Sequence, residues 1–112
     1  MKVLPLAVIL GAVLVGCGKS EPPPKSSATG AQLFEHYCAS CHRAEGTGNF
    51  LKGIPANALT RLGPDEVVDL IRKGNPEKSK MPVFSDLNRY QAERITLHLW
   101  KLRETLVEKR SR

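Results

Sequence analysis

One segment decides how this chain is interpreted: Phe34-Glu35-His36-Tyr37-Cys38-Ala39-Ser40-Cys41-His42. Two cysteines three positions apart lie on one side of a helical turn, so both thiols can reach the same flat cofactor. The pattern Cys38-x-x-Cys41-His42 is the signature of c-type haem attachment, in which thioethers form with two porphyrin vinyl groups. His42 then supplies its imidazole to the iron as the proximal ligand. The motif therefore predicts one covalently bound haem c.

A Cys-x-x-Cys pair also occurs in thioredoxin-like redox sites and in zinc sites. A thioredoxin-like site needs a βαβ context, and no segment of this sequence alternates as a strand does. A structural zinc site needs four ligands, and the only histidines besides His42 are His36 and His98. Haem attachment is the favoured interpretation. Thiol–disulfide exchange would be excluded by haem that stays bound after acid–acetone extraction.

The first 16 residues have the features of an export signal. Met1-Lys2 is a positive start, and residues 3–15 form an apolar run too short to span a bilayer as a helix. The run ends in Leu14-Val15-Gly16-Cys17, which resembles the bacterial lipobox. We therefore expect Cys17 to become the acylated first residue of an exported lipoprotein that faces the periplasm or the cell exterior. Ordinary secretion with an unmodified cysteine and an uncleaved anchor are the alternatives.

Residues 17–29 are expected to form a tether between the lipid and the folded domain. Pro22-Pro23-Pro24 favours extended polyproline II structure, and the serines of Lys25-Ser26-Ser27 loosen it. The remaining residues, 30–112, are enough for one small domain and not for two.

Composition limits the possible partners. The formal charge of +6 falls to +5 when residues 1–16 are removed, because Lys2 is their only charged residue. The basic residues lack the clustering of a nucleic-acid-binding stripe, so no nucleic acid is expected. The excess of positive charge suits negatively charged partners, namely redox proteins with acidic docking surfaces or anionic lipid headgroups. Aromatic residues make up only 5% of the chain, so a core this small needs something else to fill it.

From Gly30 to about residue 106 the chain resembles a class I cytochrome c. Gly30, Phe34 and Cys38 stand four apart, as in the first helix of that family, where the glycine and the aromatic residue meet the last helix. The resemblance implies an all-α fold with three main helices around one haem. It also implies that the carbonyl group of Pro55, in Gly53-Ile54-Pro55, accepts a hydrogen bond from the second ring nitrogen of His42.

Met81 is expected to be the second axial ligand of the iron. It is the only methionine after the signal segment, and Lys80-Met81-Pro82-Val83-Phe84 resembles the methionine–proline ligand loop of the same family. A soft thioether ligand favours ferrous iron and raises the reduction potential. The alternative is that Met81 fills the core. His98 is expected to pack in a helix seam rather than bind iron, and His36 is too close to the motif to cross the haem.

Capping signals predict two further helices. Pro64-Asp65-Glu66 opens one that ends at Lys73-Gly74, and Asn88 with Gln91 forms a capping box that opens the last helix. We expect Trp100 and Tyr90 near the haem edge or the helix seam. We also expect a frayed, solvated end that contains Lys109, Arg110 and Arg112. The last helix carries an apolar seam of Ala92, Ile95, Leu99, Leu102 and Leu106.

With both axial positions filled, the iron can change oxidation state without binding a substrate. The sequence therefore predicts a mono-haem one-electron carrier of an exported respiratory or photosynthetic chain, and not an enzyme. The alternative is a haem subunit of an oxidoreductase complex, or a gas-binding or sensing haem protein in which Met81 is labile.

Overall fold

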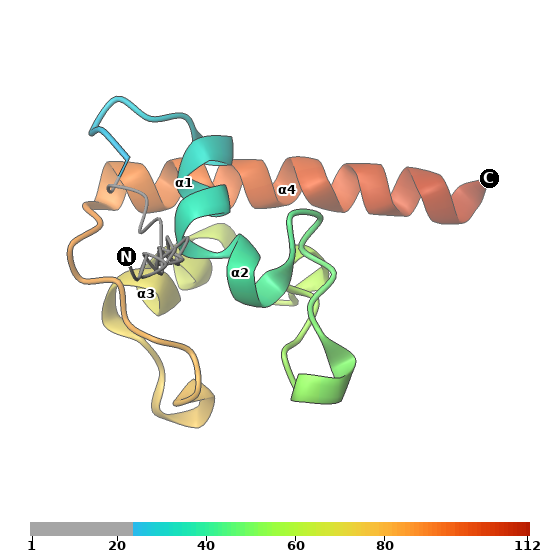
Figure 1. Ribbon diagram of the computed structural model, residues 1–112, viewed down its shortest axis with the longest axis horizontal. Coiled ribbons are helices and arrows are strands. Elements are labelled where there is room, and N and C mark those ends of the chain that lie inside the picture. The colour runs from blue at the N-terminus through green and yellow to red at the C-terminus, as the bar shows by residue number, and fades with distance from the viewer. Residues whose placement is uncertain (1–23) are drawn as a thin grey trace, which may run out of the picture.

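The computed structural model describes residues 24–112, and this part of the chain is helical and contains no strand (Figure 1). Its helices are α1 (Gly30–Tyr37), α2 (Ala39–His42), α3 (Pro64–Lys73) and α4 (Arg89–Ser111). Three 3₁₀ turns lie in the connections: η1 (Phe50–Lys52), η2 (Asn57–Leu59) and η3 (Pro76–Lys78). The expected all-α class with three main helices is confirmed, because α2 is a single turn. The expected signal peptide and Cys17 lie outside the described residues.

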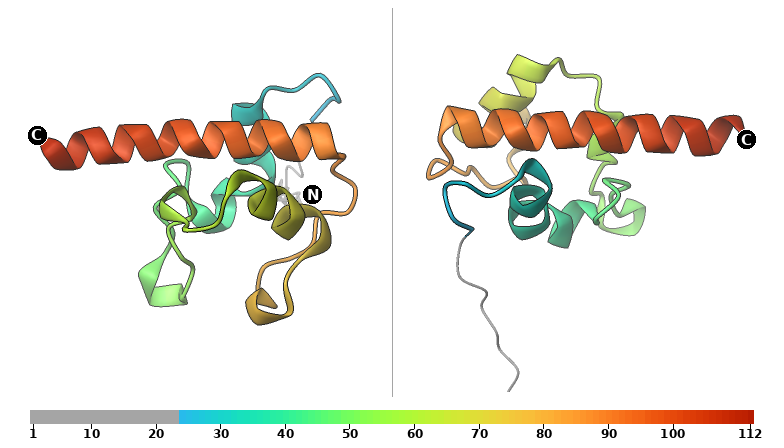
Figure 2. Two further views of the ribbon diagram at one scale, coloured as in Figure 1. Left: turned by 180° about the vertical axis from the view of Figure 1, so that it is seen from behind. Right: turned by 90° about the horizontal axis from the view of Figure 1, so that it is seen from above.

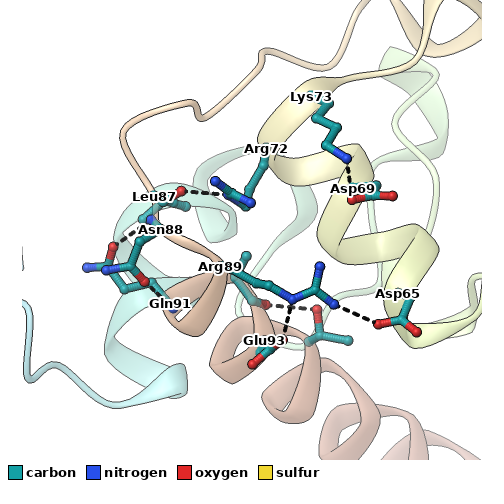
Figure 3. Close-up of polar contacts among 11 residues, drawn as sticks. Asp65, Asp69, Arg72, Lys73, Leu87, Asn88, Arg89, Gln91 and Glu93 are labelled. Atoms are coloured by element: carbon teal, nitrogen blue, oxygen red, sulfur yellow. Dashed lines mark hydrogen bonds and ion pairs between the residues drawn. The ribbon is translucent and has the colours of Figure 1, made fainter.

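Each longer helix begins where its first amide groups find a side-chain partner. Thr29 and Gln32 form a capping box at α1, with hydrogen bonds of 3.2 and 2.8 Å. The predicted box at α4 is present: the Gln91 N–H donates to Asn88 Oδ1 at 2.8 Å, and the Asn88 N–H donates to Gln91 Oε1 at 3.0 Å (Figure 3). At α3 the Glu66 carboxylate accepts from the Gly63 N–H at 2.6 Å, ahead of Pro64.

α1 and α3 both pack on α4, which runs the length of the domain (Figures 1 and 2). The contact between α1 and α4 is close at Gly30, where an ideal Cβ would lie 2.2 Å from the carbonyl oxygen of Arg94. One turn later the rings of Phe34 and His98 meet with centroids 5.3 Å apart. The predicted meeting of the glycine and the aromatic residue with the last helix is therefore confirmed.

The core lies between these helices. Ala92, Ile95 and Leu99 are buried, and Leu102 and Leu106 pack on them in part, which confirms the apolar seam. The other buried apolar residues come from all parts of the described chain: Ala28, Leu33, Phe34, Cys38, Ala58, Val67, Val68, Ile71 and Leu87.

Polar contacts join α3 to the start of α4 (Figure 3). Arg72 donates from Nε to the carbonyl oxygen of Leu87 at 3.1 Å. Arg89 pairs with Asp65 at 3.1 Å and with Glu93 at 2.8 Å. The two ion pairs of Arg89 are solvent-exposed, so each adds about 0.2–1 kcal/mol at most.

Residues 26–28 lie against α4 rather than apart from the domain. The Arg94 guanidinium donates to the carbonyl oxygens of Ser27, at 3.2 Å, and Ser26, at 3.5 Å. Ala28 is buried in the core. The end of the expected tether is therefore fixed to the domain before α1 begins.

The expectation of a frayed C-terminal end is wrong. α4 continues through Ser111, and Arg112 pairs with Glu108 one turn earlier. Lys109, Arg110 and Arg112 are exposed, as expected. The residues of this last stretch are mostly good helix formers, which explains why the helix persists beyond the core (Figure 1). Among the described residues, no helix is both long and apolar enough to cross a membrane.

Candidate haem site

A cavity of about 420 Å³ opens between the helices and the two long connections. Cys38 and His42, from the motif, line it, and so does Met81. Most of its wall is apolar, and Leu62, Val67, Leu70, Ile71, Ile95 and Leu99 are among the residues that line it. The structure thus brings the predicted histidine and methionine to one apolar space although they are far apart in sequence.

His42 is held by the loop that the resemblance indicated. Its Nδ1 lies 3.0 Å from the carbonyl oxygen of Pro55. A carbonyl oxygen only accepts hydrogen bonds, so Nδ1 must carry the proton and Nε2 keeps its lone pair. That tautomer leaves Nε2 available as a metal ligand, with Pro55 setting the orientation of the ring.

A close approach of two backbone segments places Pro55 beside His42. Gly48 has φ +71°, and a Cβ atom added to it would lie only 2.5 Å from the carbonyl oxygens of Ile54 and Pro55. No side chain therefore fits at this position. The Gly48 N–H donates to the carbonyl oxygen of His42 at 2.9 Å. The glycine therefore couples the end of the motif to the Pro55 loop.

The two cysteines of the motif have different surroundings. Cys38 is buried and lines the cavity, whereas Cys41, in α2, is exposed. Burial, and to a lesser extent the nearby Cys41, raises the pKa of the Cys38 thiol to about 12. A free thiol of that kind is a poor nucleophile at neutral pH, so Cys38 is poorly suited to attack a disulfide.

Met81 lies in a loop that is tied to α3. Its N–H donates to the carbonyl oxygen of Lys78 at 3.0 Å, and the following Phe84 N–H donates to that of Ile71 at 2.8 Å. The Phe84 ring packs edge-on against Tyr37, with centroids 5.8 Å apart. Met81 itself is half-buried at the cavity wall.

The remaining wall contains residues that the sequence did not single out. Asn57 and Thr60 line the cavity from the segment around η2. Arg103 of α4 holds this segment by donating to the carbonyl oxygens of Ala58, at 3.2 Å, and Thr60. No local pattern marks Arg103, because its partners are more than 40 residues away.

His36 and His98 do not line the cavity. His36 contacts Tyr37 edge-on, at 4.6 Å between centroids, and His98 packs on Phe34 as expected. Trp100 is packed against the core seam. Tyr90 is 64% exposed and lies under the Arg94 guanidinium, so its expected place near the haem edge or seam is wrong. Its position at the first turn of α4, ahead of the seam, explains the difference.

The donor set fits a haem and not a zinc ion. An imidazole nitrogen and a thioether sulfur border one apolar cavity, and a thiol stands in the wall beside the histidine. Within residues 24–112, no three His, Cys, Asp or Glu side chains are grouped so that they could hold a metal ion. His42 and Met81 would hold the iron, and Cys38 and Cys41 would hold the porphyrin.

A helical domain with this cavity, behind a Cys-x-x-Cys-His turn, is that of a c-type cytochrome. Comparison with known families gives the more particular assignment. The model of the family described as "Cytochrome C oxidase, cbb3-type, subunit III" matches residues 25–99. This is more than half of the chain, so the chain belongs to that family, and its cofactor is covalently bound haem c. No curated protein and no solved structure matches the chain.

Proposed function

We propose that the protein is a mono-haem one-electron carrier in which His42 and Met81 are the axial ligands. The observation that supports this proposal is the shared cavity of His42 and Met81, with the His42 ring fixed by Pro55 at 3.0 Å. When bound, the haem iron would gain and lose one electron. With both axial positions taken by the chain, no open coordination site remains for a substrate.

The surroundings of the two ligands suit electron transfer. His42 is restrained by Pro55. The Met81 loop is restrained by the hydrogen bond from Met81 to Lys78 and by that from Phe84 to Ile71. Restrained ligands move little when the charge on the iron changes, and this keeps the barrier to electron transfer low. The apolar wall excludes water and, with the thioether, favours the ferrous state.

The test is the substitution Met81→Ala in the haem-loaded protein. If Met81 is the ligand, wild type should show the weak sulfur-to-iron band near the red edge of the visible spectrum, and Met81→Ala should lose it. The variant should also bind carbon monoxide and have a lower reduction potential, on a scale of tenths of a volt. Haem should stay attached through Cys38 and Cys41.

The matched control is His98→Phe, which alters a histidine that lies outside the cavity. It should leave the band and the potential unchanged. A spectrum that changes in His98→Phe but not in Met81→Ala would assign the second ligand to histidine and overturn the proposal.

We further propose that the carrier is exported and tethered to a bacterial membrane through lipid at Cys17. Two observations support this proposal. The segment Leu14-Val15-Gly16-Cys17 resembles a lipobox, and the attachment of haem c requires that the chain be exported. Cys17→Ser should release the protein from membranes or leave it unprocessed. Wild type that is soluble after fractionation and carries no lipid mass would exclude the tether.

A second candidate is a haem subunit of an oxidoreductase complex, and the description of the matched family favours it. The two functions differ in assembly. After solubilisation, a subunit should co-elute with one oxidase complex in gel filtration. A carrier should separate from that complex in moderate salt. A sensing haem with labile Met81 would instead bind carbon monoxide in the wild-type protein.

A further inference from the structure

Two large apolar side chains at the tip of one loop are almost fully exposed. Phe50 is 94% and Leu51 is 93% exposed, and the other large apolar side chains exposed in the described residues range from 50 to 66%. Each exposed apolar side chain of this size forgoes the favourable free energy of burial. We call Phe50 and Leu51 the apolar tip.

The loop is built to hold these side chains in place. Asn49 and Ile54 form a bridge with two hydrogen bonds of 2.9 Å, and the Gly53 N–H donates to the carbonyl oxygen of Phe50 at 3.1 Å. Gly53 makes the reversal at φ +68°, in the left-handed region. A preorganised loop loses little entropy when a partner covers it.

The apolar tip stands beside the haem site. Gly53 and Pro55, which follow it within four residues, line the cavity, and Pro55 contacts His42. Phe50 and Leu51 themselves do not line the cavity. A protein that covers the tip would therefore lie next to the cofactor without replacing any part of the cavity wall.

The charge around the cavity mouth is mainly positive. Lys52 adjoins the apolar tip, and Lys78 and Lys80 line the cavity from the opposite loop, with Glu77 as the one acidic residue that lines it. Both loops extend from the same side of the domain (Figures 1 and 2). Apolar residues flanked by cations complement an apolar surface flanked by carboxylates.

We propose that the apolar tip anchors the docking of a redox protein whose face presents an apolar socket bordered by carboxylates. This inference rests on the proposed function as a carrier. A bilayer is the less suitable occupant, because it would cover the cavity mouth. In addition, the segment that contains Ser26 and Ser27, through which the proposed lipid tether enters the domain, is held on Arg94 of α4. It lies on the opposite side of α4 from the η1 loop (Figure 1).

The test uses haem-loaded protein with Phe50→Ser and Leu51→Ser together. The control carries Leu97→Ser and Val107→Ser, which remove two exposed apolar side chains of α4 that lie away from the tip. Reduced protein is mixed with intact membranes and with detergent-solubilised membranes of the organism that encodes it, and separately with hexacyanoferrate(III). Oxidation rates, the reduction potential and the sedimentation coefficient are measured.

The tip variant should be oxidised by the solubilised membranes with a kcat/KM at least about tenfold lower than wild type, as for the loss of interface anchors. The control should match wild type. The rate with hexacyanoferrate(III), which needs no apolar contact, and the reduction potential should be unchanged. Lys52→Glu should also slow oxidation by membranes, and more at low salt than at high salt.

Five results would overturn this inference. An unchanged kcat/KM would show that nothing docks on the tip. A defect seen with intact but not solubilised membranes would identify a bilayer as the occupant, and a wild-type dimer that the tip variant dissociates would identify a second copy of the chain. A changed potential would mean that the tip covers the haem. If wild type itself exchanges no electrons with the membranes, the carrier function fails, and the docking proposal fails with it.

Discussion

His98 links the α1–α4 contact to pH. Its ring packs on Phe34, and burial, followed by the positive charge of Lys101, lowers its pKa below the ordinary 6.5. Arg94, which lines the same small recess, adds a further positive charge. The folded protein therefore prefers the neutral imidazole, whereas the unfolded chain takes up a proton once the pH falls below about 6.5.

This preference predicts a pH-dependent stability that His98→Phe removes. The contribution of His98 is fully present above pH 6.5 and is lost as the pH falls through the lowered pKa. Guanidinium unfolding at pH 7.5 and at pH 5 measures the effect. Wild type should lose more stability between these values than His98→Phe does. Equal losses in the two proteins would show that His98 does not contribute.

Arg43 is the one non-glycine residue with positive φ in the described chain, at φ 65° and ψ 160°. This conformation costs a residue with a Cβ on the order of 1–3 kcal/mol, and glycine adopts it freely. Arg43→Gly should therefore raise the free energy of unfolding by about 1 kcal/mol, after the greater entropy of glycine in the unfolded chain is subtracted. Arg43→Ala keeps the strain and should give no such gain. Denaturant unfolding measures the free energy of unfolding of both variants. A higher free energy of unfolding in Arg43→Ala but not in Arg43→Gly would contradict the assignment of strain to Arg43.

At the scale of elements, the crossing of α1 over α4 depends on the absence of a side chain at Gly30. Its ideal Cβ would lie 2.2 Å from a backbone oxygen and 2.8 Å from a backbone carbon of Arg94, and neither atom can turn away. Gly30→Ala should push the helices apart and cost about 1–3 kcal/mol, as overpacking does in cores. Gly63→Ala is the control, because its nearest contact is the Glu66 side chain at 3.4 Å. Thermal melts of the two variants should differ, and equal melts would refute the close contact.

The elements that the sequence predicted are those with local signals. Pro64 with its acidic first turn marks α3, and the Asn88–Gln91 box marks α4, so both starts could be located without tertiary information. The 3₁₀ turns carry no periodic pattern, since three residues are too few for one. The end of α4 at Ser111 carries no local stop signal, because the residues beyond Leu106 are mostly helix formers that lie outside the core.

At the scale of the molecule, the candidate site was predictable where a motif or a family resemblance marked it. Cys38 and His42 follow from the motif, and Met81 and Pro55 follow from the resemblance. The structure brings all four to the wall of one cavity. Arg103 and Thr60 could not be predicted, because their contact depends on how α4 passes the η2 segment. The exposure of Phe50 and Leu51 likewise depends on the whole fold, since apolar residues are ordinarily assigned to cores.

The haem should also be part of the core, and this sets the behaviour of the chain without it. The cavity measures about 420 Å³, and empty core volume costs about 24 cal/mol per Å³, so even a third of it left unfilled would cost about 3 kcal/mol. Small domains have only about 5–15 kcal/mol of stability in total. Water entering the open side reduces the cost but leaves Leu70, Ile71 and Leu99 in contact with it.

We therefore expect the haem-free double variant Cys38→Ala/Cys41→Ala to keep helical circular dichroism but to lose a sharp thermal transition and to be cut rapidly by protease. Met81→Ala, in which both thioethers keep the haem in the cavity, should still melt cooperatively, at a temperature below that of wild type. Calorimetry and limited proteolysis on the three proteins make the comparison. A haem-free chain that melts as sharply as Met81→Ala and at a similar temperature would show that the helices alone form the core, and that the cavity serves the cofactor without depending on it.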